Sequence, residues 1–122
     1  MSAETKRRWR DYRTAAGRRP IKEFIDRLSD VDAAAVVAAM KDVRETGLAA
    51  ARHLRGEIYE VRADGDRQTF RILFAPEGRR SQVLLALEGF SKKTQKTPSE
   101  KIQLAERRLA DWRRRGGDQS HR

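Results

Sequence analysis

The sequence predicts a single α+β domain, and this prediction depends on three observations. Apolar residues recur at helical spacing before Gly47, the spacing alternates as in strands from Glu57, and a helix-start signal follows at residues 97–100. The chain has 122 residues, which suits one domain that buries roughly two-thirds of its unfolded surface. No repeat or linker divides it, so we expect one domain over residues 1–122, with 116–122 as a disordered tail.

The first half of the chain predicts an edge strand followed by an αα-hairpin. The segment RRWRDYRT (7–14) is the edge strand. Pro20 suits the first turn of a helix, because its missing N–H would have no partner there. Ser29 or Asp30 caps a second, alanine-rich helix, which Gly47 ends. The residues expected to face the core are Ile21, Phe24, Ile25, Leu28, Val36, Ala39, Met40 and Val43.

The middle of the chain predicts three strands. EIYEVRA (57–63) and RQTFRILFA (67–75) are separated by a glycine-containing turn, as in a β-hairpin. SQVLLALEGF (81–90) is apolar on both faces near its middle, so we expect it at the centre of the sheet. Side chains alternate along the second of these strands, which places Arg71 on the face opposite Phe70.

The carboxyl-terminal part predicts a capped helix. Residues TPSE (97–100) have the pattern of a capping box with Pro98 at the first helical position. The side chains that this helix is expected to bury are Ile102, Ala105, Leu109 and Trp112. Arginines at 113–115 complement the carboxyl end of the helix dipole, and Gly116 ends the helix.

Composition limits the classes of function. The net charge is +10, with 28 Lys and Arg against 18 Asp and Glu, which favours nucleic acid as a partner over acidic membranes or proteins. Without cysteine and with two histidines, the chain predicts no disulfide, no metal site and no cofactor. No apolar run is long enough to span a membrane and residues 1–10 lack a signal-peptide core, so we expect a cytoplasmic protein.

A lysine cluster and a strand arginine are the first candidates for function. Lys92, Lys93 and Lys96 follow a buried strand and precede a capped helix, which suits a binding loop, although lysine runs are often only solvated. Arg71 lies in mid-strand, where its planar side chain suits a phosphate. The alternative is that Arg71 forms an ion pair with a carboxylate such as Glu60 or Glu88.

The first hairpin strand and the segment before it each offer a further candidate. Tyr59 is most simply a half-buried sheet aromatic, but it can also stack on a base or touch a reacting oxygen. His53 has the pKa range of a general acid or base, although a lone histidine before a strand is more often structural.

Three segments resemble the RelE/HigB superfamily of bacterial toxins, and the phage Gp49-like branch in particular. They are LRGEIYEVR (54–62), FRILF (70–74) and GFSKKTQKTP (89–98), and the similarity spans roughly residues 7–115. The resemblance implies a RelE-like small twisted antiparallel sheet packed on an N-terminal αα-hairpin, with a C-terminal helix. It also implies the toxin of a type II toxin–antitoxin system.

Toxins of this superfamily are typically metal-independent endoribonucleases that cut mRNA in the ribosomal A site. The resemblance therefore implies the ribosome and mRNA as partners, together with a cognate antitoxin. In the HigB branch the antitoxin is usually a helix-turn-helix protein, through which the complex contacts operator DNA.

The resemblance also assigns roles to residues. It places Arg71 on the scissile phosphate, with Lys92 and Lys93 stabilising charge there. Basic groups that contact RNA or the ribosome match Arg55 and Arg62. We assign Lys96 and His53 to the same binding surface, and Tyr59 to the catalytic group.

The acid and base are assigned less directly. Several relatives carry a histidine or tyrosine where this chain has EGFS (88–91). Cleavage by attack of the 2′-hydroxyl needs a base, and crowding of cations lowers the pKa of a lysine enough for that role. Glu60 and Glu88 are rival bases, and Tyr59 and His53 are rival acids.

Three other functions fit part of the pattern. A nuclease acting on free RNA would use the same groups without the ribosome. A ParE-like inhibitor of DNA gyrase shares the fold but needs no arginine for phosphate cleavage, so Arg71 argues against it. A catalytically inactive basic module that binds nucleic acid is the third.

Overall fold

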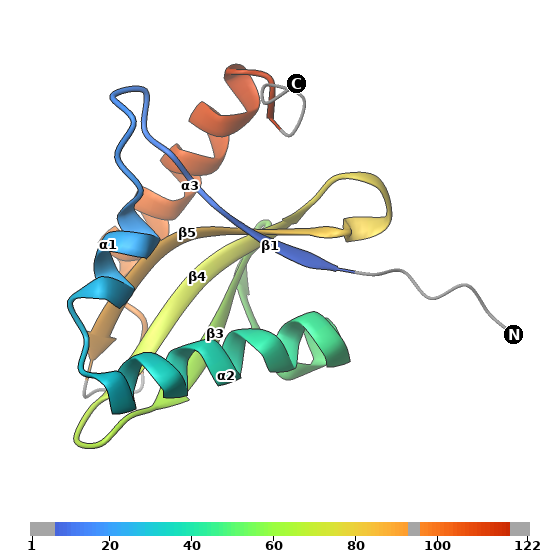
Figure 1. Ribbon diagram of the computed structural model, residues 1–122. Coiled ribbons are helices and arrows are strands. Elements are labelled where there is room, and N and C mark those ends of the chain that lie inside the picture. Colours follow the sequence, from blue (N-terminus) through green and yellow to red (C-terminus); the bar gives the residue numbers. More distant parts are fainter. Residues whose placement is uncertain (1–6, 93–95, 118–122) are drawn as a thin grey trace, which may run out of the picture.

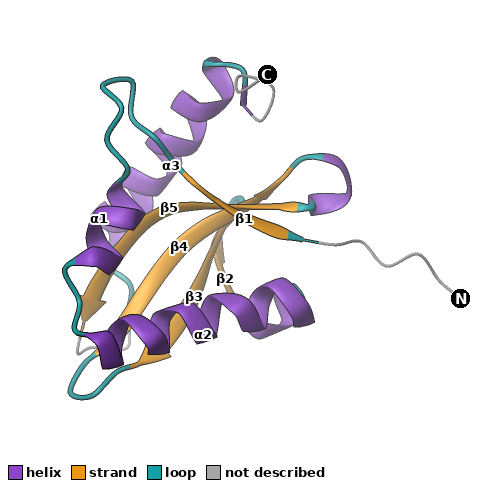
Figure 2. Ribbon diagram, viewed as in Figure 1, coloured by secondary structure: helices purple, strands orange, loops and turns teal. Residues whose placement is uncertain are grey.

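The computed structural model describes residues 7–92 and 96–117 and contains one five-stranded sheet with helices on both faces. Figure 1 shows α2 and α3 on opposite sides of the sheet, and Figure 2 shows the same view by secondary structure. The elements are β1 (Arg8–Asp11), α1 (Pro20–Asp26), α2 (Asp30–Thr46), β2 (Arg52–Arg55), β3 (Ile58–Asp64), β4 (Thr69–Glu77), β5 (Val83–Lys92) and α3 (Ser99–Arg114).

The sheet has the strand order β1-β5-β4-β3-β2. Strands β2 to β5 pair antiparallel, whereas β1 pairs parallel with β5. The α+β fold and the edge position of β1 are confirmed, but β5 lies beside the central strand β4 and not at the centre itself, and the sheet is mixed and not wholly antiparallel. A strand far from its partner in sequence is free to run parallel, since no hairpin fixes its direction.

Two apolar cores lie on the two faces of the sheet. On one face α1 and α2 contribute Ile21, Phe24, Val36 and Val43, which pack against Phe70, Ile72 and Phe74 of β4. On the other face α3 packs on Leu73, Leu85 and Leu87 with the four side chains that the sequence predicted, Ile102, Ala105, Leu109 and Trp112. The predicted alternation along β4 therefore separates the two cores, and it leaves Arg71 on the α3 face.

The two predicted helix caps have different outcomes. The Ser29 side chain accepts a hydrogen bond from the Asp32 N–H and caps α2, as predicted. The predicted capping box of α3 is wrong, because Pro98 is the N-cap residue and no side chain caps it. The Thr97 hydroxyl donates instead to Glu60, so a buried carboxylate of the sheet takes the group that the local pattern assigned to the helix.

Strand β5 carries a bulge near its middle. Leu73 pairs with Glu88 while Phe74 pairs with Ala86, so Leu87 is the extra residue. The bulge directs Glu88 toward α3, where it pairs with Lys101 (2.8 Å) and Arg108 (3.1 Å). At Gly89 a Cβ atom would lie 2.6 Å from the Phe24 ring, so only glycine allows α1 to approach this closely.

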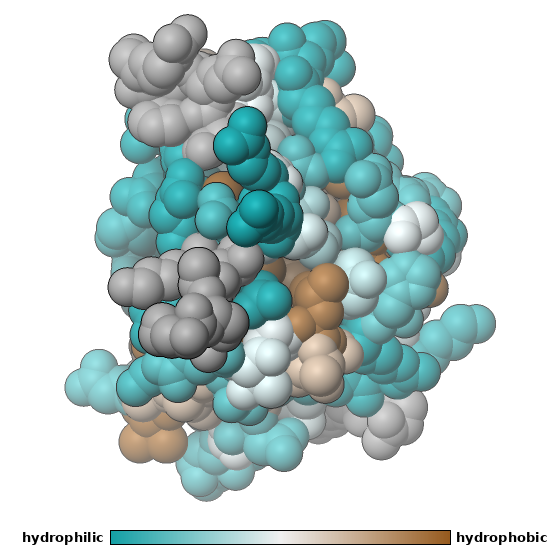
Figure 3. All heavy atoms as spheres, turned by 90° about the vertical axis from the view of Figure 1, so that its right-hand side faces the viewer, coloured by the Kyte–Doolittle hydropathy of each residue, from teal (hydrophilic) through white to brown (hydrophobic). Residues whose placement is uncertain are grey.

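The one face of the surface drawn in Figure 3 is largely polar. Figure 3 shows one face, on which hydrophilic side chains surround small apolar patches. Among the helices that the structure describes, none has the length and apolar character to cross a membrane. Of the expected tail, Gly116 is exposed and Gly117 is buried against Trp112, and residues 118–122 lie outside the described residues.

Candidate functional site

Arg71 lies in β4 on the α3 face of the sheet and is almost completely buried. Its relative exposure is 1%. One guanidinium nitrogen lies 3.7 Å from Glu60 Oε2 and donates to Thr97 Oγ1 at 3.4 Å. The sequence offered Glu60 and Glu88 as possible ion-pair partners of Arg71. The structure contains the pair with Glu60, whereas Glu88 forms ion pairs with Lys101 and Arg108 of α3.

Glu60 is the centre of this cluster. Its side chain has 0% exposure, and it accepts hydrogen bonds from Arg62 Nε (2.7 Å) and from the Thr97 hydroxyl. A buried carboxylate needs such partners, because leaving it alone in the interior would be strongly unfavourable. Glu60 therefore ties together β3, β4 and the segment that leads into α3.

The cluster contains more positive than negative charge. Burial lowers the pKa of Arg71, the positive charges of Arg62 and Arg52 lower it further, and Glu60 opposes them. Three guanidinium groups thus interact around one carboxylate. An anion brought to this face would relieve the mutual repulsion of the arginines.

A cavity of about 290 Å³ adjoins the cluster, because Thr97 belongs to both. It is lined by Arg52, Leu54, Lys96, Thr97 and Ile102, and we call it the cationic cavity. Within the described residues, the side chains of Arg52 and Lys96 have no hydrogen bond or ion pair. The cavity combines apolar walls with two available cations, which suits a ligand that has both a phosphate and a flat apolar part.

The other basic residues predicted for the site are placed less directly. Arg62 lies beside the cluster with a side chain 26% exposed. Arg55 is at the end of β2, where it pairs with Glu106 of α3 at 2.9 Å. The backbone of Lys92 pairs with Thr69 at the end of β5, and Lys93 lies outside the described residues.

Tyr59 and His53 lie on the opposite face of the sheet. The Tyr59 ring stacks on Phe74 with 5.9 Å between centroids, and His53 is tilted against it at 5.0 Å. The His53 ring nitrogen Nε2 is 2.8 Å from the Gly56 carbonyl. Because neighbouring residues of a strand point to opposite faces, Tyr59 cannot share the face of Glu60. The structure does not bring Tyr59 and His53 to Arg71, so this geometry does not support their predicted role in the same reaction.

Arg52 and Thr97 are site residues that the sequence analysis missed. Strand β2 was not predicted, since RHLR is short and largely polar. Had it been predicted, alternation would have placed Arg52 on the same face as Leu54, which packs on the α3 core. Thr97 was missed because its position before a helix indicated a cap.

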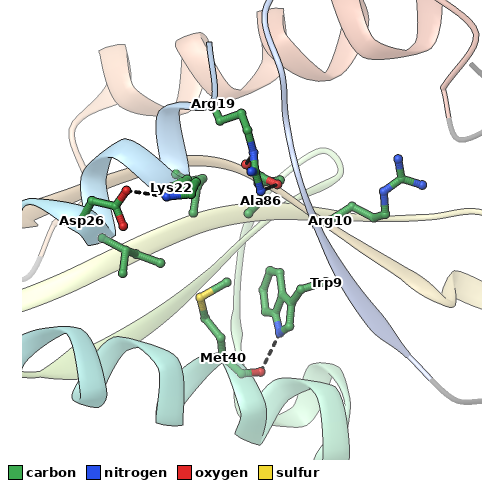
Figure 4. A pocket seen from close by; sticks show the side chains of 10 residues that line it. Trp9, Arg10, Arg19, Lys22, Asp26, Met40 and Ala86 are labelled. Carbon is green, nitrogen blue, oxygen red and sulfur yellow. Dashed lines mark hydrogen bonds and ion pairs between the residues drawn. The ribbon is translucent and has the colours of Figure 1, made fainter. Parts of the chain in front are cut away.

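A second cavity, of about 280 Å³, lies on the other side of the sheet between β1, α1 and α2 (Figure 4). Trp9, Ile21, Ile25, Met40 and Ala86 give it apolar walls, and we call it the apolar cavity. Four of its five charged lining residues form two ion pairs, Arg19 with Asp11 at 2.8 Å and Lys22 with Asp26 at 2.6 Å, and the fifth is Arg10. Within the ranges that the structure describes, no cluster of three metal-ligating side chains occurs.

The arrangement of two N-terminal helices, a five-stranded mixed sheet and a C-terminal helix is that of a small basic α+β protein of the RelE-like class. Residues 23–110 match the family described as "Phage derived protein Gp49-like (DUF891)". The chain belongs to this family and, with it, to the HigB/RelE toxins. Two relatives from Mycobacterium tuberculosis, strains CDC 1551 and H37Rv, are each named "Probable endoribonuclease HigB1". Each is 38% identical over 114 residues, which cover 90% of this chain and 88% of the relative.

Proposed function

We propose that this protein is the toxin of a type II toxin–antitoxin system and cleaves mRNA in the ribosomal A site without a metal ion. The single observation that carries the proposal is the cationic cavity, where available cations adjoin the buried cluster of Arg71, Glu60 and Thr97 on one face of the sheet. The name of the Mycobacterium tuberculosis relatives supports an endoribonuclease.

The proposed reaction is attack of a ribose 2′-hydroxyl on the adjacent phosphate. The 2′-oxygen forms a bond to phosphorus, the bond to the 5′-oxygen breaks, and the proton lost by the 2′-hydroxyl is balanced by one gained by the leaving oxygen. Negative charge grows on the phosphate, and cations fixed in place beforehand stabilise it. Such a reaction leaves a 2′,3′-cyclic phosphate and a 5′-hydroxyl.

In this proposal Arg71 acts from beneath the cavity. Because it is buried and paired with Glu60, its contribution is the positive potential that it adds and its hold on Thr97. Lys92 and Lys93 stay predicted phosphate ligands. Glu60 is enclosed by its partners and Glu88 is paired with Lys101, so a lysine is the better candidate for the base.

The proposed partners are the ribosome, its mRNA and a cognate antitoxin of the helix-turn-helix type, all in the cytoplasm. A net charge of +10 suits binding to ribosomal RNA. Each RNA phosphate that the protein neutralises adds roughly −0.7 to the slope of log affinity against log salt. We therefore expect ribosome binding to weaken steeply as salt rises.

The test is to induce the gene with and without the neighbouring antitoxin gene and to map mRNA 5′ ends. Cuts in phase with codons, suppressed by the neighbour, would support the proposal. Cleavage of free RNA by the purified protein without ribosomes would favour the simpler nuclease. Unbroken mRNA together with DNA-damage signalling would favour gyrase inhibition.

A further inference from the structure

Arg52 lies at the edge of the sheet, opposite Glu60 in the pairing of β2 with β3, and its exposed side chain lines the cationic cavity. We propose that Arg52 is a direct ligand of an RNA phosphate in this cavity. The inference rests on the proposed function and names a residue to which neither the sequence pattern nor the comparisons give a role.

The other arginines near the cavity are engaged. Arg71 is 1% exposed and lies behind Thr97, so a phosphate in the cavity meets Thr97 before it meets Arg71. Arg62 donates to Glu60 and Arg55 pairs with Glu106. A phosphate that displaced any of these would first have to break an existing ion pair.

Arg52 has no such competitor among the described residues. Glu60 is its register partner, but that carboxylate is occupied by Thr97 and Arg62 and is fully buried. The positive charge of Arg52 therefore repels neighbouring cations, and this repulsion lowers the pKa of Arg71. A phosphodiester would replace this repulsion with two parallel charge-assisted hydrogen bonds to the guanidinium fork.

The rest of the cavity suits a nucleotide more than a simple anion. Leu54 and Ile102 give it apolar walls against which a base or ribose can pack, and Lys96 supplies a second cation. The amino end of α3 begins at Ser99, two residues after Thr97, and its dipole favours negative charge nearby. The ligand class is therefore single-stranded RNA, bound through one phosphate and one flat neighbour.

The experiment compares Arg52→Ala with Arg79→Ala, which removes the same charge from the exposed connection between β4 and β5. The binding readout is the affinity for a fluorescein-labelled single-stranded RNA oligonucleotide, measured at several salt concentrations. We expect Arg52→Ala to weaken binding roughly 10- to 100-fold and to reduce the salt slope by about 0.7. Arg79→Ala should change affinity less than about 2-fold.

A third variant and a second readout keep the outcomes distinct. Arg52→Lys keeps the charge but loses the planar fork, so its affinity should fall between wild type and Arg52→Ala. Cleavage of programmed ribosomes is measured for each protein, with the thermal midpoint as a check on folding. Equal RNA affinity of folded Arg52→Ala and Arg79→Ala overturns the role of Arg52. If wild type binds RNA through Arg52 but cleaves no mRNA on ribosomes, the proposed function fails and the inference about binding stands.

Discussion

Two cavities on opposite faces of the sheet have nearly the same volume, about 280 and 290 Å³, but opposite chemistry. In the apolar cavity four of the five charged side chains form two ion pairs, one of them the bidentate pair of Arg19 with Asp11. In the cationic cavity, Arg52 and Lys96 have no counter-charge among the described residues. Size therefore does not separate the cavity that we propose to bind RNA from the apolar one. The pairing of the charged side chains separates the two cavities, because a group that is already in an ion pair is less available to bind a ligand.

The largest effect is expected from Arg71→Ala. Removing a preorganised cation next to a reacting phosphate typically costs about 10²–10³ in rate, and we expect a loss of that order in cleavage of programmed ribosomes. From the sequence alone we would expect this variant to stay as stable as wild type. Because Arg71 is the buried partner of Glu60, we now expect its unfolding free energy to fall by about 3–5 kcal/mol.

The control for Arg71→Ala is Arg71→Lys, which retains a positive charge beside Glu60. Rate and stability are measured together, cleavage by primer extension and stability by urea titration. A variant that unfolds at the same urea concentration as wild type but does not cleave would assign Arg71 to the reaction alone. Full cleavage by Arg71→Ala would remove it from the mechanism.

The second effect concerns Thr97, which joins the cationic cavity to the buried cluster. Thr97→Val keeps the shape but removes the hydroxyl that Glu60 and Arg71 share, so a buried carboxylate loses a donor. We expect the unfolding free energy to fall by about 1–3 kcal/mol. Thr97→Ser, which keeps the hydroxyl, should lose less, and equal values for the two would show that the hydrogen bond contributes nothing measurable.

Acid should destabilise the protein by protonating Asp111, which lies outside both cavities. Hydrogen bonds from Arg115 and Tyr12 lower the pKa of Asp111 from 3.8 to about 2. The folded state thus binds this proton more weakly than the unfolded state. The stabilisation is present above pH 3.8 and is lost as the pH falls toward 2. Thermal midpoints between pH 5 and pH 2 should fall less steeply for Asp111→Asn than for wild type.

The smallest effect is expected at the apolar cavity. Arg19→Ala breaks the ion pair with Asp11. Because the Arg19 side chain is 42% exposed, the loss of stability should be below about 1 kcal/mol. RNA affinity should match that of Arg79→Ala, because only the net charge changes. A loss as large as that of Arg52→Ala would break the distinction between the two cavities.

Much of the fold could be predicted because its signals are local. The face of α3 that packs on the sheet, the cap at Ser29 and the inner position of β5 all follow from spacing within one segment. Strand β2 could not be predicted, since four largely exposed residues form a strand only where β3 offers its edge. The same limit hid Arg52, whose place in the site depends on that pairing.

The sequence by itself determined the α+β class, the family and the excess of positive charge, and it marked Arg71 as an unusual residue for a strand. Only the tertiary structure decided that Arg71 is buried against Glu60, that Thr97 serves the sheet and not the helix, and that Tyr59 faces away. The physical reason is the distance along the chain over which each interaction acts. Periodicity and capping act over a few neighbouring residues, whereas the partner of a buried charge is chosen among groups that only the folded chain brings together.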